Sequence, residues 1–341
     1  MALLWIDGFE NYGTTLANRP LPAGVFARKY GVVAYEDIRT LVQAGRVSGY
    51  SMGHGWDDAG YFGQVGLTYN DTVVIGVAYY FTGLSPNYPI RLYDGTTMGI
   101  SLYRDYEGEL SITRGTGTVL ARTAGLNLSP RQWYYIELKV QCAASGTYEL
   151  HVGGNTYLSG SGNTKVGTHD YHDGFRLTGG AAYGRFDDLY FLDASGTANN
   201  DFLGNVCVVT CRADAAGDST DWTPDSGDNY ARINEQVCGD DTNYVQDDTT
   251  DDLDLYNYAA PARLTGVHGI VVCDDCKEMD ATAFNIKTVC KSASTTSADA
   301  GQAIGTTNYT TRRRVMEQDP DGPNDWNPTS LGAAQFGVQV G

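Results

Sequence analysis

The sequence RQWYYIELKV at residues 131–140, followed by GTYELHVGG at 146–154, decides the fold. Apolar and polar side chains alternate in the first segment, which is the pattern of a strand with one buried face. The apolar residues are Trp133, Tyr135, Ile136, Leu138 and Val140, and Tyr134, Glu137 and Lys139 stand between them. The alternation predicts an antiparallel strand covered on one side, and a second strand is expected at 147–151.

Similar short segments rich in Val, Ile, Tyr and Thr recur at intervals of about 8–12 residues, which is typical of a β-sandwich or barrel. The segment VVIGVAYYF at 73–81 has no polar interruption, so it is expected to be a central strand covered on both faces. Only 35–43 is expected to be helical. The strands expected in the first half are 3–6, 49–52, 61–65, 73–82, 90–94, 99–104, 109–113, 133–140, 147–151, 174–178 and 185–192. Those expected in the second half are 205–211, 264–273, 284–290, 310–316 and 335–340.

The composition of the 341 residues agrees with this pattern. Glycine supplies 42 residues, and tyrosine, at 24, outnumbers phenylalanine, at 10. Glycine favours turns, whereas tyrosine suits strands on which one end of the ring is packed and the hydroxyl is wet. The longest apolar run, 73–81, is far shorter than the about 20 residues of a membrane-spanning helix. A helical bundle, a coiled coil and a membrane protein are therefore excluded.

The charge of the chain is strongly negative and unevenly distributed. The net charge is −18, from 23 basic and 41 acidic side chains. A surface this negative repels phosphate backbones, so nucleic acid is not an expected partner. Residues 1–200 hold 14 basic and 18 acidic groups (14 − 18 = −4), and residues 201–341 hold 9 and 23 (9 − 23 = −14). The chain is therefore expected to divide near residue 200, with surface loops at the acidic tracts 214–228 and 240–254.

The first half resembles the concanavalin A-like, laminin-G-like jelly rolls that phage genomes often encode. The residues that carry the resemblance are the opening LLWIDGFENYG, the strand GRVSGYSM, the two segments quoted above, and the closing RFDDLYFLDASG. The resemblance covers residues 1 to 196. It implies an all-β fold with an N-terminal jelly-roll sandwich, and it includes no catalytic signature.

The second half resembles the C-terminal module of tailed-bacteriophage virion proteins. The matching blocks are FLGNVCVVT, AGDSTDWTPDSGDNYARINE, DDTNYVQDD, DLYNY, GVHGIVV and DPDGPNDWNPTSLGAAQFGVQV. The resemblance implies a structural protein of the particle and a smaller C-terminal β-sandwich at 197–341 that docks onto other virion proteins.

Six of the seven cysteines lie in this second half, where the resemblance does not account for them. They are Cys207, Cys211, Cys238, Cys273, Cys276 and Cys290, and Cys142 stands alone in the first half. Three interpretations are open: a zinc site on two close pairs, buried thiols, or disulfide cross-links formed after the particle leaves a reducing cytoplasm. All six are candidates for cross-linking, and Cys142 is expected to be idle.

Sugar binding needs an aromatic platform beside planar polar groups. The segment YSMGHGWDDAGY at 50–61 supplies both, with the candidates Tyr50, His54, Trp56, Asp57 and Tyr61. The alternative is that Trp56 closes one end of the sandwich, since Trp is mostly buried in folded proteins.

The sequence shows no signature of catalysis. Retaining glycosidases place two carboxylates about 5 Å apart, commonly from alternate positions of one strand. In the first half, Asp105 with Glu107 and Glu107 with Glu109 have this spacing, and both pairs fall in the turn RDYEGEL. We therefore expect no enzymatic activity, no cofactor and no metal site. Asp187 and Asp188 are candidate calcium ligands, and the alternative for them is a structural ion pair with Arg185 or a cross-strand arginine.

These observations predict a structural protein on the exterior of a phage particle, assembled in the host cytoplasm. Its expected partners are capsid, neck or tail proteins and further copies of itself, since virion proteins occupy repeated sites. The alternatives are an adhesin for host surface glycans, with avidity from many copies, and a polysaccharide hydrolase. No membrane partner is expected.

Overall fold

The computed structural model describes residues 2–12, 29–34, 43–47, 49–53, 61–180, 184–236, 241–259, 261, 264–279, 284–305, 308–322 and 324–341. The chain divides into two compact units, Met1–Val208 and Val209–Gly341. The division falls later than the boundary expected after residue 196, because residues 201–208 make their contacts with the first unit. The helix expected at 35–43 lies outside the described residues except for its last position.

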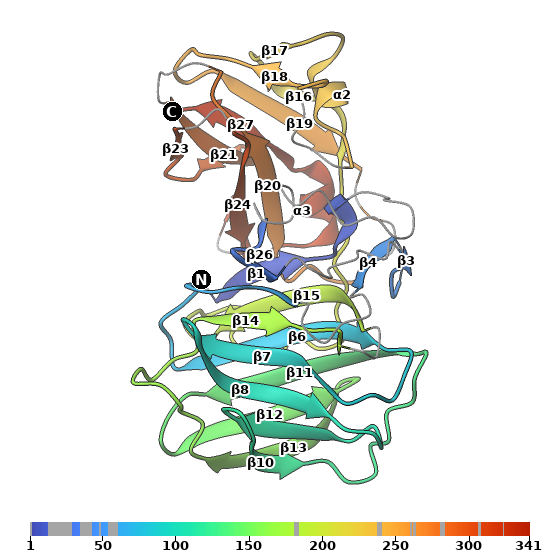
Figure 1. The fold of residues 1–341 in the computed structure, drawn as a ribbon. Helices are drawn as coiled ribbons and strands as arrows, with labels where there is room; N and C mark the ends of the chain where they lie inside the picture. The colour runs from blue at the N-terminus through green and yellow to red at the C-terminus, as the bar shows by residue number, and fades with distance from the viewer. Residues whose placement is uncertain are drawn as a thin grey trace. The chain divides into compact units, whose positions relative to one another are not determined.

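The first unit is a sandwich of two antiparallel sheets, as expected for a jelly roll (Figure 1). Sheet A has eight strands in the order β13-β12-β11-β6-β15-β4-β3, with β1 also paired to β15. Its strands are β1 (Leu3–Asp7), β3 (Gln43–Ala44), β4 (Tyr50–Gly53), β6 (Thr72–Tyr80), β11 (Trp133–Gln141), β12 (Gly146–Val152), β13 (Asn155–Gly162) and β15 (Arg185–Asp193). A short 3-10 helix, Glu10–Tyr12, follows β1.

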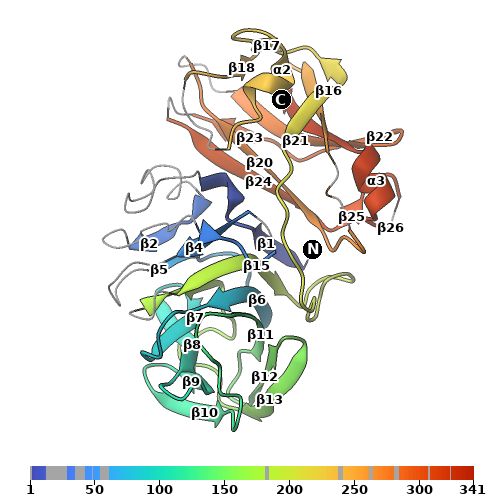
Figure 2. The same cartoon turned by 90° about the vertical axis from the view of Figure 1, so that its right-hand side faces the viewer.

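Sheet B has seven strands in the order β10-β9-β8-β7-β14-β5-β2. They are β2 (Val32–Ala34), β5 (Tyr61–Gln64), β7 (Asn87–Asp94), β8 (Thr97–Arg104), β9 (Leu110–Arg114), β10 (Thr118–Arg122) and β14 (Gly174–Leu177). Figure 2 shows the two layers from the side, with β7 to β10 on one side and β11 to β13 on the other.

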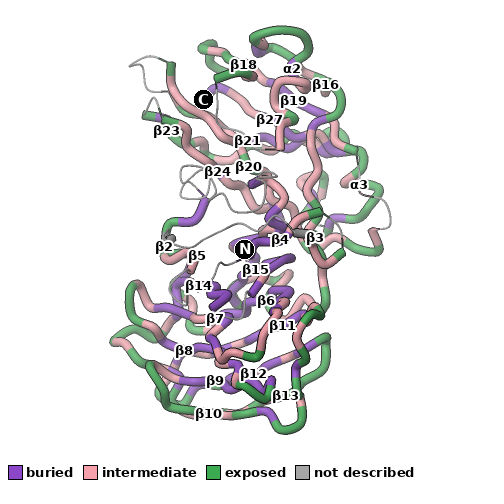
Figure 3. Tube along the Cα trace, turned by 45° about the vertical axis from the view of Figure 1, so that its right-hand side comes forward, coloured by how far each residue is buried: buried purple, intermediate pink, exposed green. Residues whose placement is uncertain are grey.

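The core between the sheets follows from the strand register. Ile136 and Leu138 of β11 lie opposite Val77 and Ile75 of β6, and all four are fully buried. Aromatic rings join the two layers: Phe175 of sheet B lies 5.4 Å from Phe191 of sheet A between ring centroids. Side chains of alternating positions thus meet in one core, and Figure 3 shows that burial is concentrated in the central strands of the unit.

The expectation that β11 is covered on one side only was wrong. Tyr134 faces the core, where its ring stacks on Phe81, whereas Tyr135 belongs to the outer face with Glu137. Tyr135 and Glu137 are nevertheless buried, because residues 201–208 lie over this outer face. Both faces of the strand are therefore covered, although its sequence alternates.

The second unit is a smaller all-β structure, also as expected. Its main sheet has the order β16-β19-β27-β21-β22, with β23 also paired to β21. The strands are β16 (Ala213–Thr220), β19 (Leu253–Tyr258), β21 (Phe284–Ser292), β22 (Thr295–Ala298), β23 (Gln302–Ile304) and β27 (Gln335–Val340). The remaining elements are β17 (Thr223–Pro224), β18 (Val245–Gln246), β20 (Ile270–Cys276), β24 (Thr310–Met316), β25 (Gln318–Asp319), β26 (Asn324–Asp325) and the helices α2 (Asn229–Arg232) and α3 (Pro328–Ala333).

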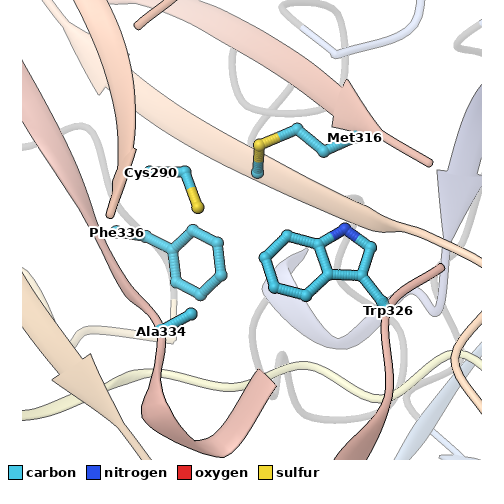
Figure 4. Packing of buried hydrophobic residues seen from close by; sticks show 5 residues of the cluster. All are labelled: Cys290, Met316, Trp326, Ala334 and Phe336. Atoms are coloured by element: carbon cyan, nitrogen blue, oxygen red, sulfur yellow. The ribbon is translucent and has the colours of Figure 1, made fainter. Parts of the chain in front are cut away.

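The core of the second unit joins the main sheet to the β20–β24 pair. Cys290 of β21 and Phe336 of β27 pack with Met316 of β24 and with Trp326, and Ala334 completes the cluster (Figure 4). Ile270 and Val272 of β20 cover its edge. Two layers of strands thus enclose apolar side chains, which is the arrangement of a sandwich.

Two expectations for the second unit were wrong. The acidic tract at 214–228 is not a loop throughout, because most of β16 lies within it. Its charged side chains point to water from an edge strand, where the backbone still pairs with β19. The segment 205–211 forms no strand; the N–H of Val208 donates to Asp188 and the carbonyl of Val206 accepts from Arg46, both side chains of the first unit.

Candidate functional site

The outer face of sheet B carries two arginines side by side. Arg176 of β14 lies directly opposite Arg91 of β7 in the strand register. Their neighbours along the strands, Phe175 and Leu92, are fully buried in the core. Since successive side chains of a strand point to opposite faces, both guanidinium groups lie on the face turned away from the core.

Tyrosine rings hold these guanidinium groups in place. The Cζ atom of Arg176 lies 3.9 Å from the ring centroid of Tyr93 and 4.7 Å from that of Tyr61. The Cζ atom of Arg91 lies 5.1 Å from the ring centroid of Tyr88, whose ring contacts that of Tyr103 at 4.8 Å. These separations are in the range of cation–π attraction. We call this set the arginine–tyrosine face: Tyr61, Tyr88, Arg91, Tyr93, Tyr103 and Arg176.

Neither arginine is neutralised within the described part of the chain. No carboxylate there pairs with Arg91 or Arg176, and the Nε atom of each is buried without a hydrogen-bond partner. Both side chains stay half-buried at the surface. A protein with a net charge of −18 thus keeps two positive charges on one sheet face, neither of which is paired with a carboxylate of the described chain. Such a pair is suited to a planar anionic group, because guanidinium donors match carboxylate and phosphate oxygens.

The structure separates the sugar-binding candidates expected from the sequence. Tyr61 belongs to the arginine–tyrosine face, whereas Tyr50 lies on β4 of sheet A, where its backbone N–H donates to Glu10. His54, Trp56 and Asp57 lie outside the described residues. The arginines were missed, although each stands between apolar residues in PIRLY and GFRL, a pattern that indicates a side chain on the outer face of a strand.

A second feature of the first unit is a strap, residues 201–208, that crosses the outer face of sheet A. The hydroxyl of Tyr190 donates to Glu137 Oε1 at 2.6 Å, and the backbone N–H of Gly204 donates to the same oxygen at 2.8 Å. The N–H of Leu203 donates to the Tyr190 hydroxyl at 3.3 Å. The strap thus hydrogen-bonds one oxygen of a carboxylate that is 1 % exposed, whereas the Oε2 atom of Glu137 is buried without a hydrogen-bond partner among the described residues.

Arg46 fixes the other end of the strap. Its Nε donates to Asp188 Oδ2 at 2.7 Å, and its terminal nitrogens donate to the side-chain oxygen of Asn205 and to the carbonyl of Val206. The N–H of Val208 donates to Asp188 Oδ1 at 2.7 Å. One guanidinium group therefore connects an internal carboxylate to the main chain of the strap.

The two adjacent aspartates have a structural role. Burial, and next the charge of Asp188, raises the pKa of Asp187 to about 8. Burial also raises the pKa of Asp188, and the charge of Arg46 opposes that shift. The partner of the pair is Arg46, from the segment before β4, rather than Arg185. Among the described residues, no group of three or more His, Cys, Asp and Glu side chains is placed so that it could hold a metal ion.

The cysteines differ in access to solvent. Cys207 and Cys273 are exposed, and Cys211 and Cys276 are half-buried. Cys290 is fully buried in the core of the second unit, so burial takes it out of the cross-link candidates. Cys142 is also buried, and Cys238 lies outside the described residues. Burial, and next the charge of Asp188, raises the pKa of the Cys207 thiol.

Among the helices that the structure describes, none has the length and apolar character needed to cross a membrane.

No family model and no curated protein matches the sequence. Solved structures that share the sandwich include the alginate lyase Aly36B, which is 10 % identical, has a TM-score of 0.39, and covers 55 % of this chain and 96 % of its own. An endo-β-1,4-glucuronan lyase from the fungus Trichoderma reesei is 10 % identical, with a TM-score of 0.36, over 48 % of this chain and 90 % of its own. The galectin LEC-6 of Caenorhabditis elegans is 12 % identical, with a TM-score of 0.28, over 38 % of this chain and 88 % of its own.

These similarities are similarities of fold, and they correct one prediction. The expectation that the chain is not an enzyme was wrong, because the similar structures include lyases as well as a lectin. That expectation rested on the absence of a carboxylate pair of the glycosidase type. The absence of such a pair argues only against hydrolysis by that mechanism.

Proposed function

We propose that the first unit binds an acidic polysaccharide on the arginine–tyrosine face. The observation that carries the proposal is Arg176, which is held between Tyr61 and Tyr93 and pairs with no acidic side chain of the described chain. Tyrosine rings offer flat surfaces to the apolar faces of sugar rings, and the two arginines offer donors to their acidic groups. A neutral glycan would leave the guanidinium donors unused, so the charge favours an anionic one.

The overall charge of the chain limits how tightly such a ligand binds. A net charge of −18 repels a polyanion at long range, and salt screens both this repulsion and the attraction of the face. Binding at one face is therefore expected to be weak, and many copies on one particle would raise the avidity.

Replacing Arg176 by alanine is expected to weaken binding of polygalacturonate at least tenfold, because the variant loses the better-stacked guanidinium and its two tyrosine contacts. Affinity electrophoresis in gels that contain polygalacturonate or neutral dextran measures the effect. Arg131→Ala is the matched control, since Arg131 is an exposed arginine of the same unit outside the face. Equal retardation of the wild type by dextran and polygalacturonate would contradict the proposal.

We also propose that the chain lies on the exterior of a tailed-phage particle, with the second unit docked on neighbouring virion proteins and further copies alongside. The support for this role is the resemblance of residues 197–341 to a virion module. Cys207 and Cys273 add to it, because their exposure makes them available for bonds to a neighbouring chain. Host surface glycans are then the natural ligand class for the first unit.

Purified virions are expected to show bands above the monomer on non-reducing gels, and these bands should collapse with reductant. Loss of the bands in a Cys207→Ser or Cys273→Ser variant would identify the bonding thiol. Because thiolate is the reacting species and the pKa of Cys207 is raised, its bonds should form faster as the pH rises from 7 to 9. Cys290→Ala, a change at a buried thiol, should leave the bands intact. A single monomer band under both conditions would refute cross-linking.

A further inference from the structure

The opposite sheet of the first unit carries a second arrangement of an arginine with aromatic rings. In the register of sheet A, Arg185 of β15 lies opposite Tyr80 of β6, and Tyr80 lies opposite Trp133 of β11. Their strand neighbours Phe186 and Tyr79 face each other in the core, where both are fully buried. The row of Arg185, Tyr80 and Trp133 therefore lies on the outer face of sheet A.

The row has the same chemistry as the arginine–tyrosine face. The Cζ atom of Arg185 lies 4.6 Å from the ring centroid of Tyr80, and the rings of Tyr80 and Trp133 are 5.4 Å apart. All three side chains are half-buried. Burial lowers the pKa of Arg185.

Arg185 has no acidic partner among the residues that the structure describes, and its Nε atom is buried without a hydrogen bond. Asp187 is the next side chain on the same face of β15, but its oxygens already accept hydrogen bonds from the backbone N–H groups of Arg46 and Asp188. A half-buried cation that lacks an acidic partner among the described residues and lies beside two aromatic rings suits an anionic group on a flat ring.

We propose that Arg185, Tyr80 and Trp133 form a second site for acidic sugars, so that one chain bridges two polysaccharide strands. The proposal rests on the function proposed above for sheet B. Packed sheets are about 10 Å apart, and the two sites lie on the outer faces of the two sheets. A single sugar unit therefore cannot contact both, and each site must take its own segment of ligand.

Titration calorimetry with tetragalacturonate tests the number of sites on the full chain. The wild type should bind two oligosaccharides per chain, Arg185→Ala and Arg176→Ala should each bind one, and the double variant should bind none. Polygalacturonate should turn turbid with the wild type and stay clear with either single variant, because bridging needs two sites. Thermal unfolding of each variant checks folding, and Trp133→Ala provides a second change at the new site that keeps the charge.

The outcomes separate this inference from the proposed function. One site in the wild type that is lost in Arg176→Ala and kept in Arg185→Ala would overturn the second site and leave the proposed function standing. Binding that survives in the double variant, or no binding by the wild type, would overturn both. The second site would be supported if the wild type bound two oligosaccharides per chain and if Arg185→Ala and Trp133→Ala each bound one.

Discussion

Replacing Arg46 by alanine is expected to lower the free energy of unfolding of the first unit by about 3–5 kcal/mol, the usual effect of removing one partner of a buried ion pair. The side chain of Asp188 is 3 % exposed and that of Arg46 is 14 % exposed, so water cannot replace the lost charge. The variant also loses the donors to Asn205 and Val206, which hold the strap. Denaturant titration followed by tryptophan fluorescence measures the change.

The control for this prediction is Arg131→Ala, which removes the same charge at an exposed position of the same unit. The midpoint of unfolding should stay close to that of the wild type. The prediction extends to the strap itself, since limited proteolysis should cut near residues 201–208 faster in Arg46→Ala than in the control. Equal midpoints for Arg46→Ala and Arg131→Ala would show that the strap and the aspartate pair do not depend on Arg46.

Replacing Gly337 by alanine is expected to prevent stable folding of the second unit. Gly337 lies on β27 between Leu255 of β19 and Val289 of β21, in the middle of the main sheet. A Cβ atom there would overlap the backbone carbonyl oxygen of Asp254, and backbone in a central strand cannot move aside without breaking the ladder. The expected cost is above about 4 kcal/mol, which is exceptional for one methyl group.

Differential scanning calorimetry separates this effect from changes in the first unit. The transition of the second unit should disappear or move to much lower temperature in Gly337→Ala, whereas that of the first unit should stay. Gly305→Ala is the matched control, because a Cβ at Gly305 meets no atom within 4 Å. If the second unit of Gly337→Ala unfolded at the same temperature as that of Gly305→Ala, the sheet would accommodate the added Cβ atom and the prediction would be wrong.

The alternation of apolar and polar residues predicted most strands of the first unit, because every second side chain there enters the common core. The pattern failed for strands whose side chains are polar on both faces. The edge strand β13, Asn155–Gly162, is almost wholly polar and was missed, since its backbone pairs with β12 while its side chains stay in water. Strand β16 was missed for the same reason.

The candidate sites could not be predicted from the sequence, because they depend on pairing between strands that are far apart in the chain. Arg91 and Arg176 are 85 positions apart (176 − 91), and only the register of β7 with β14 places them side by side. Tyr61 was identified from its own segment, but for a loop platform rather than for the sheet on which it lies. The sequence predicts a strand at 205–211, whereas residues 205–208 belong to the strap, where Val206 and Val208 bond to side chains instead of to another strand.

The strap also gives the chain a reserve of length under mechanical load. A force that pulls the second unit away from the first would load the contacts that hold the strap, which are the hydrogen bonds with Arg46, Glu137 and Asp188, the Lys139–Asp201 ion pair and the stacked rings of His151 and Phe202. When they yield, residues 194–208 can extend to about 50 Å, at about 3.3–3.6 Å per residue. The ladder between β15 and β6 need not open during this extension. A ligand bound by the first unit as proposed would therefore stay bound while the connection to the second unit lengthens.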